Sequence, residues 1–276
     1  MRRIGCHVSI AGGITNAPGR AEELGCEVFQ MFTRSPQGGM APKITSEIAE
    51  EFKSAMKASN QAECYIHTPY YINFASEKES LRKNSVRIAR EELERGSLIG
   101  AKYVMTHLGS SKEGDRQKAM ELAAQSVKEI LHGYKGSTEL LLEISAGVGS
   151  LMGCTFEELA EIRDKSRQEV GVCIDTAHMF AMGYDIRTLK AVAETEKKIS
   201  ATVGKKSIKL VHANDSKVDL GERKDRHDHI GDGKIGRDGF VHLLSTFDLD
   251  FILETEHDKV EQDIVVLKDI RAKIKT

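Results

Sequence analysis

The chain has 276 residues, of which 40% are hydrophobic and 30% are charged, and its formal net charge is −2. That length allows a sizeable core, but a nearly neutral chain cannot bind nucleic acid through its overall charge, so any such contact must come from a local basic patch. The five cysteines are scattered and include no CxxC pair, which argues against a zinc knuckle or a disulfide framework.

The N-terminus, Met1-Arg2-Arg3, leads directly into sequence that polar residues interrupt. No apolar segment there is long enough for a signal peptide or a membrane-spanning helix. Together with the unpaired cysteines, this predicts a protein of the reducing cytoplasm that has no membrane partner.

Short apolar runs alternate with helix-like segments along the whole chain. Such runs fill strands that are buried on both faces of a sheet. The predicted strands are residues 4–8, 27–32, 64–67, 103–107, 140–143, 170–175, 209–212 and 251–254. The predicted helices are residues 15–24, 46–59, 78–99, 115–131, 155–166, 186–203, 237–246 and 258–274. Thr155 and Glu158 form the pattern of a capping box at the start of one of these helices.

This alternation predicts an α/β protein in which a parallel sheet closes into a (β/α)8 TIM barrel, as a single domain over residues 1–276. The alternative is a doubly wound open sheet. Its strand ends also share one edge, but they lie in a line that could not surround a metal cluster. No internal repeat other than the strand–helix unit is present.

Six of the predicted strands end on a residue that can bind a metal. A buried strand gains nothing by ending on an acid or an imidazole, because burial of an unpaired polar group costs free energy. The six strand-end residues are His67, His107, Glu143, Asp175, His212 and Glu254. In a barrel, the carboxyl ends of all strands open on one face, so we expect these side chains to form one ring there.

Two further elements add candidate ligands. His178 follows Asp175 by one helical turn, and Asp225-Arg-His227 has a spacing that points both side chains the same way in an extended segment. The second pair lies in a polar, glycine-rich loop, residues 214–236, which is long for a strand–helix connection. Zinc typically takes about four ligands including solvent, so these donors suggest three ions, with two as the conservative number. Imidazole and carboxylate donors also suit manganese and iron. Any one of the histidines, taken alone, would be explained as a hydrogen-bonded core residue.

Several motifs resemble those of the endonuclease IV family, the zinc-dependent apurinic/apyrimidinic endonucleases with a (β/α)8 fold. GVCIDTAHMFAMGYD (residues 171–185) and DRHDHIGDGKIG (residues 225–236) carry the most specific part of this resemblance. Shorter matches span nearly the whole chain in the family's order: IGCHVSIAGG, IHTPYYIN, HLGS, LEISAG, HANDS and ILET. The family's motifs account for every candidate ligand.

The resemblance implies three zinc ions. His67, His107 and Glu143 would hold the first ion; Glu143 would bridge to the second, which Asp175, His212 and Glu254 complete. His178, Asp225 and His227 would hold the third.

The resemblance also implies the reaction. The substrate would be damaged double-stranded DNA, cut at the phosphodiester 5′ to an abasic site to leave a 3′-hydroxyl and a 5′-deoxyribose phosphate. Blocking groups on 3′ ends would also be removed. Glu143 and Glu254 would be catalytic, because they orient and polarise a water whose pKa metal binding lowers to about 7. No organic cofactor is required, and we expect a monomer.

Candidate DNA-binding residues lie in the loops after the second and third strands and in residues 214–236. Tyr70 and Tyr71, just past His67, match the family's wedge position, where an aromatic ring suits stacking. Arg34, Gln37 and Arg226 are the other candidates. Some family members place a bulky aromatic residue and an arginine where this chain has Gln37-Gly38-Gly39. The strength with which this chain recognises an abasic site is therefore expected to differ.

A sugar isomerase or epimerase of the xylose-isomerase-like barrels is the alternative function. Such an enzyme holds one or two divalent ions, for which Glu143, Asp175, His212 and Glu254 would suffice. The third ligand set, with His178, has no purpose in that chemistry, so metal content distinguishes the two hypotheses. A relic that binds metal or DNA without catalysis is a third possibility, but a relic has no reason to keep every donor.

Overall fold

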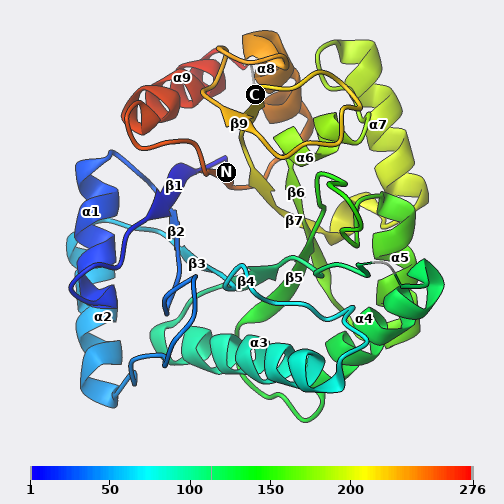
Figure 1. The fold of residues 1–276 in the computed structure, drawn as a ribbon. Helices are drawn as coiled ribbons and strands as arrows, with labels where there is room; N and C mark the ends of the chain where they lie inside the picture. Colours follow the sequence, from blue (N-terminus) through cyan, green and yellow to red (C-terminus); the bar gives the residue numbers. More distant parts are fainter. Residues whose placement is uncertain (1, 113, 275–276) are drawn as a thin grey trace.

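The computed structural model describes residues 2–112 and 114–274, and its central feature is a closed barrel of parallel strands (Figure 1). Around the barrel, the order of the strands is β1-β10-β7-β6-β5-β4-β3-β2. Their bounds are β1 Ile4–Val8, β2 Phe29–Met31, β3 Cys64–His67, β4 Tyr103–Thr106, β5 Glu139–Glu143, β6 Gly171–Asp175, β7 Ile208–His212 and β10 Phe251–Leu253. The predicted (β/α)8 barrel is confirmed.

Helices surround the strands in Figure 1 and cover the outer face of the barrel. They are α1 Ala17–Glu23, α2 Ser46–Ala58, α3 Glu79–Ile99, α4 Arg116–Leu131, α5 Phe156–Ser166, α7 Leu189–Ala201, α8 Gly236–Thr246 and α9 Val260–Lys273. The sequence predicted all of these within a few residues. The capping box is half formed: Thr155 accepts a hydrogen bond from the Glu158 amide, but the Glu158 carboxylate accepts from the amides of Gly153 and Cys154 instead.

Three elements of the described residues that lie near the carboxyl ends of the strands were not predicted. The short helix α6, Thr176–Ala181, directly follows β6. The other two are the strands β8, Asp215–Ser216, and β9, His227–Asp228, which pair as an antiparallel ribbon within the long loop after β7. Periodicity does not identify segments of two to six residues, because they are shorter than the patterns that distinguish helix from strand.

The interior of the barrel is packed with apolar side chains rather than hollow. These side chains form a cluster distinct from the larger core between strands and helices, and they come from all around the barrel: Val28, Tyr65, Tyr103, Met105, Leu141, Cys173, Leu210 and Ile252. A filled interior of this kind is usual for eight-stranded barrels. It separates the carboxyl ends of the strands from their amino ends.

An ion pair closes the amino end of the barrel where the first and last strands meet. Arg3, just before β1, donates to both carboxylate oxygens of Asp250, just before β10, with Nη2 2.6 Å from Oδ2 and Nε 2.9 Å from Oδ1. The hydroxyl of Tyr65, from the interior cluster, donates to the same carboxylate. Charge-assisted bidentate bonds of this kind are among the stronger hydrogen bonds in proteins.

We therefore expect Asp250→Asn to lower the free energy of unfolding by about 2–3 kcal/mol, because it removes a charge-assisted acceptor from partly buried Arg3 and from buried Tyr65. The measurement is urea unfolding followed by circular dichroism. Glu63→Gln is the matched control, since Glu63 lies 4.0 Å from the same guanidinium but is more exposed. A similar loss of stability in both variants would contradict the assigned role of Asp250.

Candidate metal centre

Nine side chains that can bind metal converge at the carboxyl ends of the strands. Five are imidazoles and four are carboxylates. His67, Glu143, Asp175 and His212 are the last residues of β3, β5, β6 and β7. His107 and Glu254 directly follow β4 and β10, and His178 lies on α6. Asp225 and His227 come from the long loop after β7. The structure thus brings together every candidate ligand that the sequence identified.

The donors form three overlapping groups, each with ligand atoms within 4.8 Å of one another. One group is His67, His107 and Glu143. The second is Glu143, Asp175, His212 and Glu254, and the third is Asp175, His178 and His227. Asp225 adjoins the third group, with Oδ1 3.3 Å from Nε2 of both His178 and His227. Glu143 belongs to the first two groups, as the family resemblance implied, and Asp175 belongs to the second and third.

Two of the histidines, His67 and His178, are held in the tautomer that a metal ligand needs. Nδ1 of His67 lies 2.6 Å from the carbonyl oxygen of Thr68, and Nδ1 of His178 lies 2.9 Å from that of Ile144. A carbonyl oxygen only accepts, so the proton is on Nδ1 in each ring. Nε2 therefore presents its lone pair to the cluster when the imidazole is neutral. A hydrogen bond from the far nitrogen is the usual way in which proteins orient such ligands.

His212 also turns one ring nitrogen toward the other donors. It is oriented by a glutamine side chain that was not predicted as part of the site. Nε2 of His212 lies 2.8 Å from Oε1 of Gln30, which can only accept, so Nδ1 faces Glu143 Oε1 at 3.0 Å and Glu254 Oε2 at 3.1 Å. The Gln30 amide nitrogen donates to the other oxygen of Glu254 at 2.6 Å and contacts His7. One side chain in β2 therefore orients two candidate ligands.

Asn214 is a second positioning residue that was not predicted. Its Nδ2 donates to Asp175 Oδ2 at 2.6 Å, and its Oδ1 accepts from the backbone amide of Glu254 at 2.7 Å. Signals for both residues exist in the sequence. Gln30 is a polar residue inside an apolar strand, and Asn214 is two residues past a strand end, where a short amide has backbone and carboxylate partners within reach.

The electrostatics of the site favour cations. Glu143 and Asp175 are completely buried, and a buried carboxylate is costly unless a positive partner compensates it. Burial opposes the charge of Glu143, but the imidazoles of His107 and His212 hold its pKa well below the usual range. Burial lowers the pKa of His178, but the carboxylates of Asp175 and Asp225 outweigh that effect and raise it to about 10.

Several donor atoms are buried without a hydrogen-bond partner. Among the described residues these include Oε2 of Glu143, Nε2 of His178 and Nε2 of His227. Buried polar atoms are normally satisfied, so orphaned atoms within one cluster need an explanation. Metal ions supply it, because each orphan faces the other candidate ligands and offers a lone pair when its imidazole is neutral or its carboxyl is ionised. The residues present therefore fit a multinuclear metal site.

A carboxylate holds in place the loop that carries Asp225 and His227. Asp215 accepts hydrogen bonds from the backbone amides of Gly231, Ile235 and Gly236 at 2.9–3.1 Å. A Cβ atom on Gly233 would lie 2.5 Å from Oδ1 of Asp215, so only glycine allows this close approach. These bonds hold residues 231–236, at the end of the loop, beside β8.

Three other histidines lie near the mouth without joining the donor groups. His7 contacts Gln30 through Nδ1 at 3.0 Å, and burial lowers its pKa to about 3, so its ring is neutral. His229 pairs with Asp263 of α9 at 2.7 Å, and Nε2 of His257 lies 3.0 Å from the carbonyl oxygen of His7. His229 and His257 thus connect loops around the site, and His7 remains available to a bound molecule.

Four of the five candidate DNA-binding residues have exposed side chains. Tyr70 is 70% exposed and Tyr71 is 38% exposed, and the ring of Tyr70 packs edge-on against Phe32 and beside His67. Gln37 and Arg226 are also exposed. These positions are compatible with DNA contact, which stays a prediction for each of them.

Arg34 is different, because it is buried and already paired. Its side chain is almost inaccessible, Nη2 lies 2.9 Å from Glu91, and Nε donates to Glu92, which is itself completely buried. A DNA phosphate would have to displace both carboxylates. The structure therefore speaks against direct phosphate contact by Arg34 and gives it a structural role: it fixes the start of the loop after β2 to α3.

Comparisons with known proteins agree with this geometry. Residues 18–272 match a family model described as a xylose isomerase-like TIM barrel. A relative from Natronomonas pharaonis, named "Probable endonuclease 4", is 38% identical over 258 residues, which cover 92% of each chain. The solved structure of endonuclease IV from Thermus thermophilus is 34% identical and covers 98% of each chain, with a TM-score of 0.83.

A D-tagatose 3-epimerase-like protein has the same fold, with a TM-score of 0.77 over 99% of this chain and 98% of that one. At 19% identity, this likeness shows the fold alone. In addition, none of the helices in the described part of the chain is both long and apolar enough to cross a membrane.

Proposed function

This chain belongs to the endonuclease IV family, and from that premise we propose that it cuts damaged double-stranded DNA at the phosphodiester 5′ to an abasic site. The products would be a 3′-hydroxyl and a 5′-deoxyribose phosphate, and blocking groups on 3′ ends would be removed in the same site. The observation that carries the proposal is the third donor group, in which His178 and His227 lie within 4.8 Å of Asp175. A sugar epimerase has no use for it.

We propose that the site holds three zinc ions, although manganese or iron would fit the same donors. His67, His107 and Glu143 would hold one ion, and Asp175, His212 and Glu254 would complete a second that shares Glu143. His178, Asp225 and His227 would hold the third. The three overlapping groups and the orphaned donor atoms support this number, since four negative charges close together need several positive charges.

When bound, the ions would supply Lewis acidity: they neutralise phosphate charge and provide a nucleophile at neutral pH. The side chains do the rest. Glu143 and Glu254 approach the same His212 nitrogen, so their carboxylates lie side by side and can orient and polarise a water at the site. Gln30 holds Glu254 through a 2.6 Å hydrogen bond, which keeps that carboxylate aimed at the site. Titratable side chains perform this chemistry, and we propose no organic cofactor.

Recognition of the lesion would fall to the exposed side chains around the mouth. Tyr70 adjoins the metal centre through His67, and Tyr71 follows it in the chain; an exposed aromatic ring can fill the gap that a missing base leaves. A nucleotide without a base is also the least costly to extrude from the duplex. Gln37 and Arg226 would contact the neighbouring backbone.

The test is a duplex that carries one tetrahydrofuran abasic analogue, labelled at one 5′ end and incubated with the purified protein. We expect a single cut on the 5′ side of the analogue, and we expect prolonged treatment with a chelator to abolish it. Added zinc should restore the cut. An undamaged duplex of the same sequence is the control. If the metal-loaded protein leaves the abasic duplex intact, the proposed function is wrong.

We propose a monomer that works in the cytoplasm. The five cysteines support this location, since all of them are free thiols, as expected of a reducing compartment. A monomeric state is compatible with the site, because all nine donors come from one chain.

A further inference from the structure

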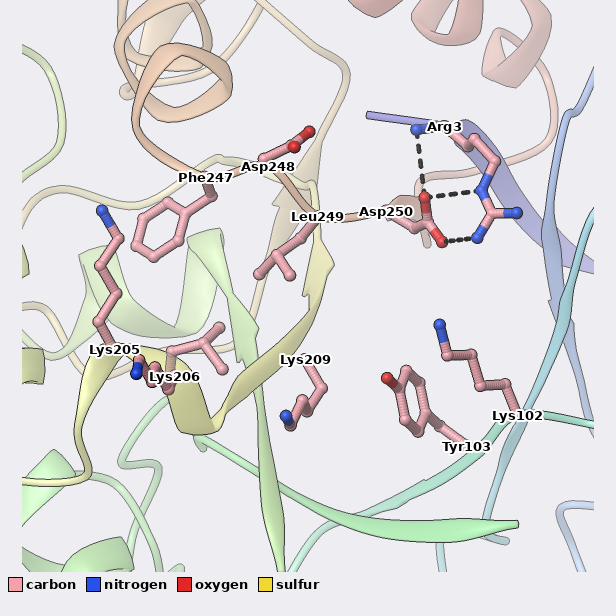
Figure 2. Close-up of a pocket in the computed structure, with 11 residues that line it drawn as sticks. Arg3, Lys102, Tyr103, Lys205, Lys206, Lys209, Phe247, Asp248, Leu249 and Asp250 are labelled. Carbon is pink, nitrogen blue, oxygen red and sulfur yellow. Dashed lines mark hydrogen bonds and ion pairs between the residues drawn. The ribbon is translucent and has the colours of Figure 1, made fainter. Parts of the chain in front are cut away.

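A basic cavity lies at the opposite end of the barrel from the metal centre. Its volume is about 570 Å³, which is in the range of small-molecule sites. It forms where four segments precede β1, β4, β7 and β10, and its walls include Tyr103, Phe247 and Leu249 (Figure 2). Nothing in the proposed reaction uses this end of the molecule.

Five basic side chains line the cavity, against two acidic ones. The basic residues are Arg3, Lys102, Lys205, Lys206 and Lys209, and the acidic ones are Asp248 and Asp250. Arg3 pairs with Asp250, Lys205 pairs with Glu196 outside the cavity, and Asp248 is also engaged. For Lys102, Lys206 and Lys209, no carboxylate of the described residues lies within ion-pair distance. The cavity thus carries an uncompensated positive charge.

The backbone directs one of these lysines into the cavity. In the pairing of β6 with β7, Val172 is opposite Ile208 and Cys173 is opposite Leu210, so Lys209 is an extra, bulged residue. A bulge of this kind redirects a side chain. Lys209 Cγ would lie only 2.8 Å from a Cβ atom on Gly171, so glycine at that position leaves room for the lysine's stem.

A hydroxyl donor adjoins the lysines. The Tyr103 ring stacks on Tyr65, with centroids 5.8 Å apart, and Nζ of Lys102 lies 5.2 Å from the centre of the Tyr103 ring. Unlike the Tyr65 hydroxyl, the Tyr103 hydroxyl makes no hydrogen bond to another residue in the described part of the chain. Several ammonium groups and one hydroxyl around a small space match a ligand with several charged oxygens, and lysine is a common phosphate binder.

We propose that this cavity, between Lys102, Lys206 and Lys209, binds a small molecule that carries an oligophosphate group. The phosphate oxygens would accept from the three ammonium groups and from Tyr103, and the apolar walls would exclude water from one side. Free oligophosphate and the phosphate chain of a nucleotide share this chemistry. The inference is independent of the proposed DNA cleavage, because the packed barrel interior separates the two sites.

The test is calorimetric titration of the metal-loaded protein with inorganic tripolyphosphate and, in a second arm, with ATP. We expect both to bind, and we expect Lys102→Met/Lys209→Met to weaken binding by about tenfold or more, since each tenfold step needs only a small loss of interaction. The matched control is Lys57→Met/Lys190→Met, which removes two exposed lysines elsewhere and should leave the affinity unchanged. Equal affinities for the two probes would indicate free oligophosphate, and tighter binding of ATP would indicate a nucleotide.

Oligophosphates also coordinate metals, so the probes could bind at the metal centre instead of in the cavity. The comparison of the lysine variants with the wild type distinguishes these two sites. If tripolyphosphate fails to bind the wild type, or binds all variants equally, the proposal is overturned. It is also overturned if an undamaged duplex binds through Lys102 and Lys209 while neither small probe does. Should the double variant fold poorly, Lys206→Glu takes its place. Lys206 is exposed, so reversal of its charge should weaken binding without disturbing the core.

Discussion

Replacement of Glu143 by glutamine is expected to abolish cleavage at the abasic site, with a fall in kcat of at least about 10³-fold, equivalent to about 4 kcal/mol of barrier. Glu143 belongs to two of the three donor groups, and its carboxylate faces His67, His107 and His212. An amide of the same size keeps the packing but removes the charge that both groups share.

The measurement is single-turnover cleavage of the abasic duplex, with metal content determined by elemental mass spectrometry. The control is Glu139→Gln, at the exposed, opposite end of the same strand β5, which should keep wild-type activity. Circular dichroism should show the same fold in both variants. Wild-type cleavage by Glu143→Gln would remove the basis of the proposed function.

The second large effect is expected from Asp225→Asn. Asp225 lies 3.3 Å from both His178 and His227, and its pKa is lowered: burial opposes this, but the two imidazoles outweigh it. Loss of its charge should weaken only the third donor group, so we expect metal content to fall from three ions per chain to two and cleavage to fall by about 10²-fold.

Asp219→Asn is the matched control for this experiment. Asp219 is an exposed acid in the same loop and lies 3.7 Å from Lys234, so its loss should change neither metal content nor cleavage. If Asp225→Asn retains both the metals and full activity, the third group has no part in the reaction. The third group would then no longer distinguish this chain from the sugar epimerases.

The barrel and the positions of the donors could be predicted from the sequence because both follow from strand patterning. A buried parallel strand is a run of apolar residues, and a ligand at its end stands out. His67, Glu143 and Asp175 are the last residues of their strands, as expected. Once the barrel closes, topology alone brings the strand ends together, so no detailed contact was needed for the prediction.

The partners of the donors could not be predicted in the same way. Gln30 and Asn214 act through distances of 2.6–2.8 Å to residues that are far away in sequence, which no local pattern encodes. Arg34 was expected at the surface because it lies in a polar loop. Its burial depends on Glu91 and Glu92 of α3, which form its partners only in the folded chain.

The direction of the Lys209 side chain could not be predicted from the sequence either. Strict alternation along β7 would not place its side chain toward the cavity, but one extra residue in the pairing with β6 does. A bulge depends on the neighbouring strand, and a single sequence gives no signal for it beyond the small residue Gly171, which has other possible explanations.

The apolar cluster inside the barrel affects how substitutions can accumulate at its two ends during evolution. Tyr65, Leu141 and Ile252 belong to one buried apolar cluster that lies between the two mouths of the barrel. Packed side chains therefore separate substitutions around one mouth from the other mouth. Selection can therefore change the two mouths separately, so a lineage could gain or lose the proposed amino-end ligand while the nine donors at the other mouth stay in place.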